Sequence, residues 1–366
     1  MKVHIVGAVG IPAKYGGFET LAENLTVRNS QSYEFSVYCS TKVHLNNLKQ
    51  HNSARLIRVP LQANGIQSIP YDILSMLHAS RKSDVLLILG VSGCSFLPVF
   101  RLFFHKKIIV NIDGLEWKRA KWSDPARSFL KYSEKMAVRH ADVVVVDSRV
   151  LVEYVRKEYG KEAVFIPYGG DHANKVPITD ETREIFPFVN SPYAFKVCRI
   201  EPENNVRMIL EAFRNYSGLN LAVVGNWQNS AYGRGLRREF ENCHNIFMLD
   251  PVYDQNLLNQ LRGSCALYVH GHSAGGTNPS LVEAMHLGLP IAAYDVNYNR
   301  ETTNQEAFYF SDTAGLKSII DTLNPEHSGR VGVAMAEYAR EHYTWDIVSR
   351  AYAGLFGEDS RQERTS

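Results

Sequence analysis

Residues 268–290 read YVHGHSAGGTNPSLVEAMHLGLP, and this stretch predicts a strand, a glycine loop, a helix and a second strand. Residues 267–269 form a short apolar run of the β type. Asn278 is a favourable N-cap residue, and Pro279 suits the first helical position, where its missing N–H costs nothing. Gly288 favours the end of the helix, and an apolar run follows it. We therefore expect a β-loop-α-β unit here.

The loop of this unit indicates an anion-binding site. A loop with free N–H groups ahead of a helix N-terminus binds anions, and phosphate is the expected ligand. Gly276, Thr277 and Asn278 are the candidate phosphate-binding residues. Glu283 lies about one turn into the helix, from where its carboxylate can accept hydrogen bonds from sugar hydroxyls. A phosphate beside a sugar suggests that the ligand is a nucleotide sugar.

The composition is that of a globular protein with room for two domains. The chain has 366 residues, of which 45% are hydrophobic and 21% are charged. The net charge of +2 argues against nucleic acid as a partner. The five cysteines form no C-x-x-C pair, which suggests reduced thiols and a cytoplasmic location. No window reaches the roughly 18 apolar residues of a membrane span, and the N-terminus reads as a strand rather than a signal peptide.

Apolar runs alternate with helical patterns along the chain, which predicts an α/β fold. Runs such as DVLLIL (84–89) and DVVVVD (142–147) fit strands buried on both faces of a parallel sheet. The expected strands are residues 3–6, 35–38, 85–89, 107–112, 143–146, 164–166, 193–198, 219–224, 245–248, 266–269, 291–293 and 307–310. The expected helices are residues 18–28, 129–139, 149–158, 206–215 and 315–323. Residues 171–192 are rich in proline, so we place a linker there between two nucleotide-binding halves.

Anchor residues in both halves give the chain a family resemblance. They are Gly16 and Gly17 in AKYGGFET, Arg199 in CRIEPENN, Gly225 in AVVGN, and the GGTNPSLVEAM helix. On these residues the chain resembles the retaining glycosyltransferases of family 4. The resemblance implies two Rossmann-like domains facing across a cleft, the GT-B arrangement, with an acceptor-binding domain at 1–175 and a nucleotide-sugar-binding domain at 190–344. It also implies that a last helix, at about 345–366, packs back on the first domain.

A narrower resemblance concerns the stretches GIPAKYGGFETLAENL, NIDGLEWKRAKWS and CRIEPENN. These stretches are similar to those of a bacterial group of rhamnosyltransferases. This resemblance implies transfer of L-rhamnose from dTDP-L-rhamnose, with retention of configuration, onto a lipid-linked saccharide during cell-surface polysaccharide synthesis. UDP- and GDP-sugars stay open as alternative donors.

The sequence departs from the broad family's pattern at certain positions. Glu283 matches the second of two glutamates that the family carries, but the first falls on Gly275. The lysine that the family often places five residues after Arg199 is replaced by Asn204. The active-site histidine of the family's first domain falls at Asp113.

The candidate donor-binding side chains also have structural interpretations. The Arg199 guanidinium could hold the diphosphate through bidentate bonds and stabilise the leaving group, or it could pair with Glu201 or Glu203. Glu283 could bind ribose or be a solvated helix glutamate. Lys196 lies within an expected strand, and we give it a peripheral place.

The residues of the first half have two interpretations as well. Gly16 and Gly17 could let the backbone approach the donor, or they could form a tight strand–helix turn. Asp113 is our candidate catalytic residue, and Glu116 is our candidate on the acceptor side. Their structural alternatives are a turn aspartate and a helix-start glutamate. Gly225 is carried over from the resemblance as a donor-binding residue.

The sequence predicts chemistry without a metal or any other cofactor. It contains no H-E-x-x-H motif and no D-x-D pair that would hold a metal-bound diphosphate. The spacing of His270 and His272 is poor evidence for a metal site. We expect Arg199, the loop N–H groups and a helix dipole to take the place of the cation.

A basic stretch with tryptophans predicts contact with a membrane surface. Its residues are Trp117, Lys118, Arg119, Lys121, Trp122, Arg127, Lys131 and Lys135. The neighbouring stretch LPVFRLFFHKK (97–107) is apolar with a basic end. Together they could dock on anionic lipid at the cytoplasmic face of the inner membrane, where a lipid-linked acceptor would lie. The alternative is a solvated helix face beside a core helix.

A hydrolase is the competing prediction from another class. Residues 271–275 fit the G-x-S-x-G elbow of α/β-hydrolases, with Ser273 as nucleophile. Its partners would be Asp295 or Asp312 and then His327 or His342. Against this, a helix starting at the elbow would carry Pro279 in its second turn, at a cost of about 3 kcal/mol. A third alternative is a regulatory protein that binds a nucleotide sugar without catalysis.

Overall fold

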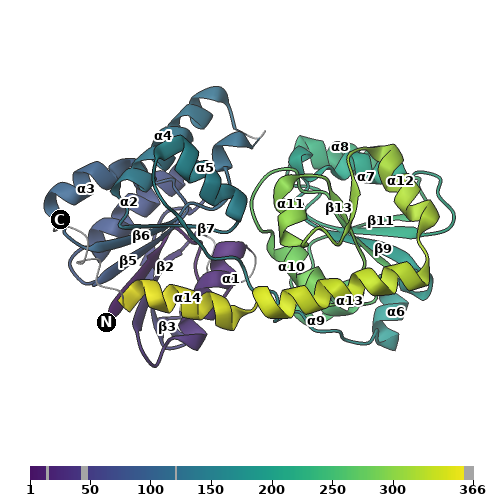
Figure 1. The fold of residues 1–366 in the computed structure, drawn as a ribbon, viewed down its shortest axis with the longest axis horizontal. Helices are drawn as coiled ribbons and strands as arrows, with labels where there is room; N and C mark the ends of the chain where they lie inside the picture. Colours follow the sequence, from purple (N-terminus) through teal and green to yellow (C-terminus); the bar gives the residue numbers. More distant parts are fainter. Residues whose placement is uncertain (14–15, 43–47, 120–121, 358–366) are drawn as a thin grey trace. The chain divides into compact units, whose positions relative to one another are not determined.

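The computed structural model describes residues 1–13, 16–42, 48–119 and 122–357, and it divides the chain into two compact α/β units (Figure 1). The first unit contains residues 1–118 and 122–168 together with the C-terminal segment that starts at Trp345. The second unit contains residues 169–344 and Arg119. Both are α/β units, as the alternating pattern of the sequence predicts.

The boundary between the units differs from the expected one. Residues 169–175 were expected in the first half, and the linker was expected at 171–192. In the structure, the N–H of Gly170 donates to the carbonyl of Tyr343 at 2.8 Å, which ties this segment to the second unit. Helix α6 (Asp180–Ile185) forms inside the supposed linker. It is too short and polar to carry a visible apolar period, so its sequence resembles that of a loop.

The first unit is built on one eight-stranded sheet. Its strands are β1 (Lys2–Val6), β2 (Glu34–Ser40), β3 (Gln50–His51), β4 (Ala54–Val59), β5 (Val85–Leu89), β6 (Lys107–Asn111), β7 (Val143–Val146) and β8 (Val164–Phe165). They lie in the order β3-β4-β2-β1-β5-β6-β7-β8, and all neighbours are parallel except β3 and β4. Its helices include α1 (Gly17–Arg28), α2 (Ser68–Ala79), α3 (Leu97–Phe103), α4 (Asp124–His140) and α5 (Arg149–Tyr159).

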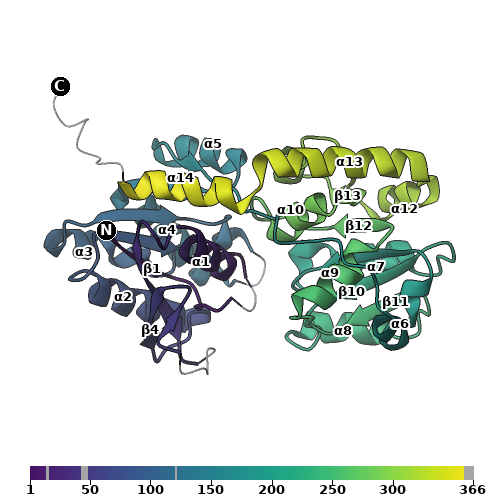
Figure 2. The same cartoon turned by 90° about the horizontal axis from the view of Figure 1, so that it is seen from below.

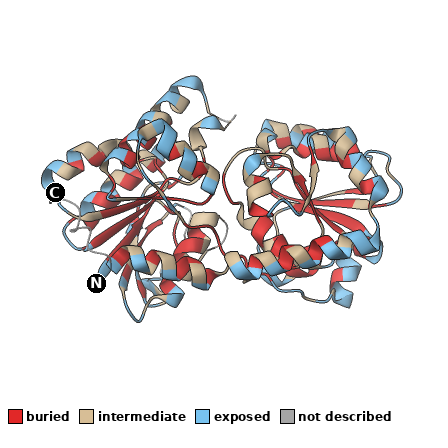
Figure 3. Cartoon of the chain, viewed as in Figure 1, coloured by how far each residue is buried: buried red, intermediate tan, exposed pale blue. Residues whose placement is uncertain are grey.

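The second unit is built on a six-stranded, fully parallel sheet. Its strands are β9 (Tyr193–Val197), β10 (Asn220–Val224), β11 (Ile246–Leu249), β12 (Leu267–His270), β13 (Ile291–Tyr294) and β14 (Phe308–Phe310). After α6 its helices are α7 (Val206–Phe213), α8 (Ala231–Glu239), α9 (Gln255–Gly263), α10 (Pro279–His286), α11 (Asn297–Thr302), α12 (Thr313–Thr322) and α13 (Pro325–His342). Figure 3 shows the strands of both sheets as largely buried, which confirms the expectation of parallel strands covered on both faces.

The strand orders place a switch point in each sheet. The second sheet runs β11-β10-β9-β12-β13-β14, which is the Rossmann order. The chain therefore winds outward in opposite directions from β9 and from β12. The first sheet reverses in the same way between β1 and β5. Ligands of such sheets bind beyond the carboxyl ends of the strands at this point.

Helix α10 follows the signals of its sequence. Pro279 occupies its first turn, and Leu281, Ala284 and Met285 are buried. Gly288 adopts a φ of 58°, and its N–H donates to the carbonyl of Met285 at 2.8 Å, which ends the helix as expected. The strand, loop, helix and strand read from residues 268–290 are thus all present.

The C-terminal helix α14 (Trp345–Gly357) belongs to the first unit. It packs on α1, where the carboxylate of Asp346 lies 2.8 Å from Nε of Arg28. Farther along, the Tyr352 hydroxyl accepts a hydrogen bond from the side chain of Asn111 at 2.8 Å. The resemblance implies a helix of this kind. Residues 358–366 lie outside the described residues.

Two glycines of α13 provide a test of how closely this helix packs on α10 (Figure 2). A β-carbon at Gly332 would lie 2.5 Å from the carbonyl oxygen of Gly288, whereas a β-carbon at Gly329 would meet nothing within 4 Å. We expect Gly332→Ala to lower the free energy of unfolding by about 1–3 kcal/mol, because the helix must move. Gly329→Ala should raise it by about 0.5–1 kcal/mol.

Urea unfolding of the two variants, followed by circular dichroism, measures both effects. The variants make the same chemical change in one helix, so helix propensity cannot explain a difference between them. Equal stabilisation by both would show that α13 does not depend on the close approach at Gly332.

Candidate functional site

The switch point of the second sheet brings the predicted donor residues to one edge. Arg199 follows β9, and the loop of residues 271–278 follows β12, the neighbouring strand. Two contacts join these segments. The Ser273 N–H donates to the carbonyl of Glu203 at 2.8 Å, and the Asn205 side chain donates to the carbonyl of Gly271 at 2.9 Å. The loop is therefore held against the segment that carries Arg199.

The Arg199 side chain is about half-exposed, with a relative accessibility of 46%. Its Nε lies 3.8 Å from a carboxylate oxygen of Glu201, which is a loose ion pair at a partly solvated position. Its carbonyl accepts a hydrogen bond from the Asn204 side chain at 2.7 Å. Asn204 is thus turned toward the backbone and buried, and it does not offer the cation that the family resemblance expects there.

The glycine loop ends at the N-terminus of α10. Gly275 has a φ of 123°, which a residue with a β-carbon rarely adopts, while Gly276 and Thr277 are buried. Asn278 occupies the N-cap position, but its side chain does not cap the helix. Its amide approaches the carbonyl of Gly276 at 3.4 Å instead. The local chain is shaped as the sequence predicts, although the cap is made by backbone geometry alone.

Glu283 has structural partners that the sequence did not reveal. Its carboxylate pairs with the fully buried guanidinium of Arg262 on α9 and lies 3.0 Å from Nε2 of His172. Burial by itself would raise the pKa of Glu283, but attraction to Arg262 and the contact with His172 outweigh it and lower the pKa to about 2. The carboxylate is therefore ionised and ties three segments of the second unit together.

Gly16 and Gly17 lie at the switch point of the first sheet, at the start of α1. Gly16 has a φ of 119°, and a β-carbon there would lie 2.0 Å from the Glu19 carboxylate. Glu19 is buried and accepts the N–H of Val9 at 2.7 Å. At Gly17 a β-carbon would lie 3.1 Å from the Tyr168 ring. Local packing thus requires a glycine at Gly16 and leaves little room for a side chain at Gly17, and the contact of both residues with a donor stays a prediction.

Gly225 is required in the same sense. It follows β10, and a β-carbon there would lie 2.5 Å from the Ile200 side chain and 2.6 Å from the carbonyl of Cys198. The absence of a side chain lets the segment after β9 lie against the end of β10. Donor contact at Gly225 also stays a prediction.

Asp113 follows β6 in a left-handed conformation, with a φ of 59°. Its N–H donates to the side chain of Asn111 at 2.9 Å. Burial raises the pKa of Glu19, and the negative charge of Asp113 adds to this effect. A partly exposed aspartate in a sparsely populated conformation at a sheet edge is typical of functional positions. The structure therefore brings Asp113 near the start of α1.

Glu116 lies in a 3-10 turn (Glu116–Lys118) and accepts the indole N–H of Trp122 at 3.0 Å. This contact braces the segment after Asp113. The structure gives Glu116 an anchoring role, and its place beside an acceptor stays a prediction.

The basic stretch is less available than the sequence suggests. Lys131 points its ammonium at the rings of Trp117, Tyr154 and Tyr159, at 4.6–5.0 Å from their centroids. It also lies 3.0 Å from the carboxylate of Glu158. The expectation that Lys131 faces lipid is therefore wrong, because aromatic rings and a carboxylate already compensate its charge. Lys121 lies outside the described residues.

The hydrolase alternative lacks its geometry. The Ser273 hydroxyl donates to the carbonyl of Glu203 at 2.8 Å, and α10 begins at Pro279 rather than directly after the serine. The proposed partners are engaged elsewhere: Asp295 pairs with Arg300, Asp312 caps α12, His327 packs on Phe308 and His342 stacks on Tyr338. In the described part of the chain no hydrogen bond joins Ser273 to a histidine. The structure thus gives this alternative no triad.

Two buried polar side chains near this loop, Lys196 and His270, are not among the predicted site residues. Lys196 is 1% exposed and His270 is fully buried, and neither has a hydrogen-bond partner among the residues that the structure describes. A lysine inside the buried run YAFKV was the available signal. Its place in the interior corrects our peripheral assignment of Lys196.

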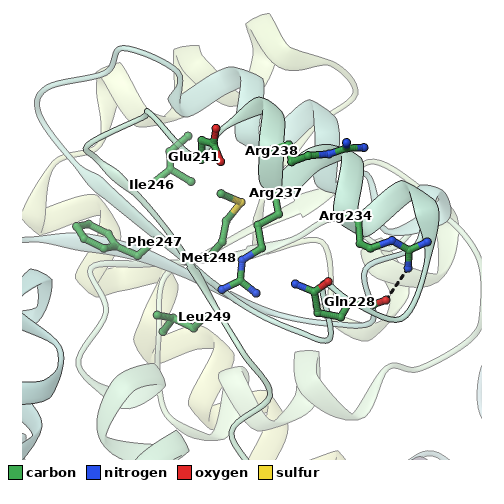
Figure 4. A pocket seen from close by; sticks show the side chains of 9 residues that line it. All are labelled: Gln228, Arg234, Arg237, Arg238, Glu241, Ile246, Phe247, Met248 and Leu249. Carbon is green, nitrogen blue, oxygen red and sulfur yellow. Dashed lines mark hydrogen bonds between the residues drawn. The ribbon is translucent and has the colours of Figure 1, made fainter.

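A separate cavity of about 720 Å³ lies between α8 and the edge strand β11 (Figure 4). Arg234, Arg237 and Arg238 line it together with Phe247 and Met248. Arg237 pairs with Asp250 at 2.7 Å. The cavity lies at the outer strand of the sheet rather than at the β9–β12 switch point, so it is distinct from the candidate site.

The described residues contain neither a metal-ligand cluster nor a membrane-spanning helix. Within them, no group of three or more histidine, cysteine, aspartate or glutamate side chains could hold a metal ion. None of the helices that the structure describes is long and apolar enough to cross a membrane.

The ion pair of Glu283 leads to a prediction about pH. Because its folded pKa lies below the ordinary value of 4.5, the pair stabilises the fold fully above about pH 4.5 and loses this effect as the pH falls toward 2. We expect Glu283→Gln to lower the free energy of unfolding by about 3 kcal/mol at pH 7, with the gap from wild type narrowing below pH 4.5.

Urea unfolding of wild type and variant at pH 7 and pH 3.5 measures the gap. The matched control is Glu337→Gln on the exposed side of α13, which should change stability little at either pH. A gap of constant size at both pH values would contradict the assignment of the low pKa to Glu283.

Both halves of the chain are similar to known protein families. Residues 178–323 match the family model Glycosyl transferases group 1, and residues 1–171 match a domain of unknown function, DUF1972. Protein CapJ of Staphylococcus aureus is 23% identical over 197 residues, which cover 49% of this chain. The chain spans 45% of the length of that relative.

Similar structures extend over nearly the whole chain. Sucrose-phosphate synthase of Thermosynechococcus elongatus has a TM-score of 0.82 at 16% identity, with 97% of this chain and 98% of that chain covered. HepE of Anabaena, solved in complex with UDP-glucose, has a TM-score of 0.77 at 13% identity, with 97% and 98% covered. At these identities the similarity shows the fold. Residues 178–323 are therefore similar to the group 1 glycosyl transferases, and the chain as a whole has the fold of the GT-B glycosyltransferases.

Proposed function

We propose that the protein is a retaining glycosyltransferase that transfers L-rhamnose from dTDP-L-rhamnose to a lipid-linked saccharide in bacterial cell-surface polysaccharide synthesis. The observation that carries the proposal is the β9–β12 switch point of the second unit. There a half-exposed Arg199 and a glycine loop at a helix N-terminus share one sheet edge. This is the edge at which sheets of this order bind nucleotides.

The donor is assigned to the second unit. Its diphosphate would lie on Gly276, Thr277 and Asn278 at the N-terminus of α10, where the helix dipole favours an anion. Arg199 would bind the same group through its guanidinium. Glu283 would accept a ribose hydroxyl with the lone pairs that Arg262 and His172 leave unused.

The choice of donor rests on two lines of support. HepE, which shares this fold, was solved with UDP and with UDP-glucose, which supports a nucleotide sugar in general. The rhamnosyl group and the dTDP carrier rest on the resemblance of NIDGLEWKRAKWS and its companion stretches to bacterial rhamnosyltransferases. A UDP- or GDP-sugar would use the same phosphate contacts.

The acceptor is assigned to the first unit, near Asp113 and Glu116, with Gly16 and Gly17 at the same sheet edge. Retention would follow from attack on the face that the leaving group departs from. The acceptor oxygen bonds to the anomeric carbon, the bond from that carbon to the phosphate oxygen breaks, and the acceptor proton passes to the departing phosphate. Arg199 would stabilise the negative charge of the leaving diphosphate, so this scheme uses no metal.

The first experiment is thermal unfolding of the purified protein with dTDP-rhamnose, UDP-glucose, UDP-GlcNAc, GDP-mannose and the free nucleotides, with and without EDTA. We expect the dTDP ligands to raise Tm selectively, because binding to the native state stabilises it by mass action. We expect EDTA to leave this rise unchanged, because the proposed scheme uses no metal. A rise in Tm with another nucleotide in place of dTDP would mean that the donor is a different nucleotide sugar. No shift with any of them would overturn the proposed function.

Turnover of Arg199→Ala tests the site itself. We expect a rate about 10²–10³-fold lower at unchanged Tm, since a charge-assisted contact to the leaving group is lost. The matched control is Arg330→Ala on α13, whose side chain is exposed and lies 4.0 Å from Glu326. Near-normal turnover in Arg199→Ala would remove Arg199 from the site.

Contact with the cytoplasmic face of the inner membrane belongs to the same proposal. Val99, Leu102 and Phe103 on α3 are 44%, 74% and 71% exposed. Arg139 and Lys135 on α4, the helix that packs against α3, are exposed as well. Apolar side chains beside basic ones suit an anionic lipid surface.

We expect replacement of Leu102 and Phe103 by serine to lower co-sedimentation with phosphatidylglycerol vesicles about tenfold, because their apolar area no longer enters the lipid. Val333→Ser on α13, which is 58% exposed in the second unit, is the control and should leave it unchanged. Equal sedimentation of all three proteins would argue against α3 as the contact.

A further inference from the structure

Polar atoms of three side chains lie without hydrogen-bond partners at the loop that follows β12, among the residues that the structure describes. Nζ of Lys196, both ring nitrogens of His270 and Nδ1 of His272 are buried and have no hydrogen-bond partner among the described residues. Lys196 is 1% exposed, and His270 is fully buried. Burying a polar group without a partner is energetically unfavourable, and such groups are few in native proteins. Their concentration at one switch point indicates a use for them.

The position of the Lys196 ammonium is defined by Gly271. A β-carbon at Gly271 would lie 3.0 Å from Nζ of Lys196 and 2.4 Å from the carbonyl oxygen of Asn204. Nζ of Lys196 therefore ends beside Gly271, which also lies close to the backbone of residue 204. Residue 204 is where the family resemblance expects a lysine and where this chain has a buried asparagine.

The histidines continue this group toward the loop. The rings of His270 and His272 stack with centroids 4.3 Å apart and planes inclined by 15°. His270 is deep in the unit, while His272 is partly exposed. Burial lowers the pKa of His272, and the basic groups of His270, Lys196 and Arg199 act in the same direction. An anion placed on the loop would offset this repulsion.

We propose that Lys196, His270 and His272 form the floor of the diphosphate subsite, with the Lys196 ammonium taking the place of the lysine that is absent at residue 204. This inference rests on the proposed function. Arg199 approaches the anion from the partly exposed side, and Lys196 acts on it from beneath Gly271. His272 offers an imidazole N–H between them. The lack of any side chain at Gly271 keeps the ammonium within a short, poorly screened distance of the loop surface.

The test compares a nucleoside diphosphate with its monophosphate on the full chain. Calorimetric titration gives the affinity of wild type for dTDP and dTMP, or for the UDP or GDP pair if the protein prefers that base. We expect Lys196→Met to reduce the preference for the diphosphate about 10- to 100-fold and to leave the monophosphate affinity unchanged. Tm should rise, because an apolar side chain of similar length replaces an unpaired buried ammonium.

The matched control is Lys317→Met on α12, which removes an exposed lysine from the same unit and should change neither affinity. His272→Gln is the second variant, because this residue is partly exposed and its replacement spares the core. It should also reduce the preference for the diphosphate. If Lys196→Met fails to fold, the result with His272→Gln decides.

The outcomes separate this inference from the proposed function. If wild type binds no nucleoside diphosphate, both fail. If wild type binds the diphosphate tightly and the variants keep its preference over the monophosphate, the inference about Lys196 is overturned while the glycosyltransferase proposal stands. A rise in Tm of Lys196→Met together with loss of the preference supports the inference, since a merely structural lysine would not produce both.

Discussion

The buried ion pair between Arg262 and Glu283 is the constraint on which the second unit depends most. The guanidinium of Arg262 is fully buried, and within the described part of the chain only its Nη1 has a hydrogen-bond partner. A charge in that position is tolerable only with a carboxylate beside it. The pair joins α9 to α10, and His172 adds the segment that enters the unit. The helix whose N-terminus forms the candidate anion site is thereby fixed from its buried side.

Glycines impose the second constraint, and they explain why the loops around both switch points are so specific in sequence. Gly225 and Gly271 let backbone segments approach where any side chain would collide. Gly16 leaves room for the carboxylate of Glu19, which in turn holds the N–H of Val9. Sequence motifs that resemble ligand-binding fingerprints thus serve packing at the same time, so a motif alone does not separate the two roles.

The core of the fold could be predicted from the sequence because its strands are continuous apolar runs. Every expected strand has an observed counterpart with ends that differ by at most two residues. Other elements were not predicted, among them β4 and α8. Strand β4 lies next to the terminal strand β3 and has buried residues interrupted by exposed ones, and α8 contains Gly233 and Gly235 among charged residues. Short polar elements of this kind are stabilised by what they pack against, which a local pattern does not contain.

The position of the candidate site could be predicted from the sequence, but the ion pair of Glu283 and the burial of Lys196 could not. The placement of Arg199 and the loop beside each other follows from strand order alone. The partner of Glu283 lies twenty-one positions earlier in the sequence, on another helix, and no spacing rule connects them. The sequence analysis gave Lys196 a peripheral place, although lysines are rarely fully buried and this one lies within an apolar run. Its burial becomes visible only once β9 is known to be a central strand.

The first unit is built from two parts of the chain that are far apart in the sequence, and this affects the order in which the units are completed during synthesis. Helix α14 buries Trp345 and Tyr352 in that unit, yet it is synthesised after the whole of the second unit. On the ribosome, residues 169–344 can complete their sheet while the first unit still lacks its last helix. The surface that α14 covers on the first unit is then still exposed. The first domain to emerge is therefore the last to be finished, and a chain truncated before residue 345 would carry a complete second unit and an incomplete first one.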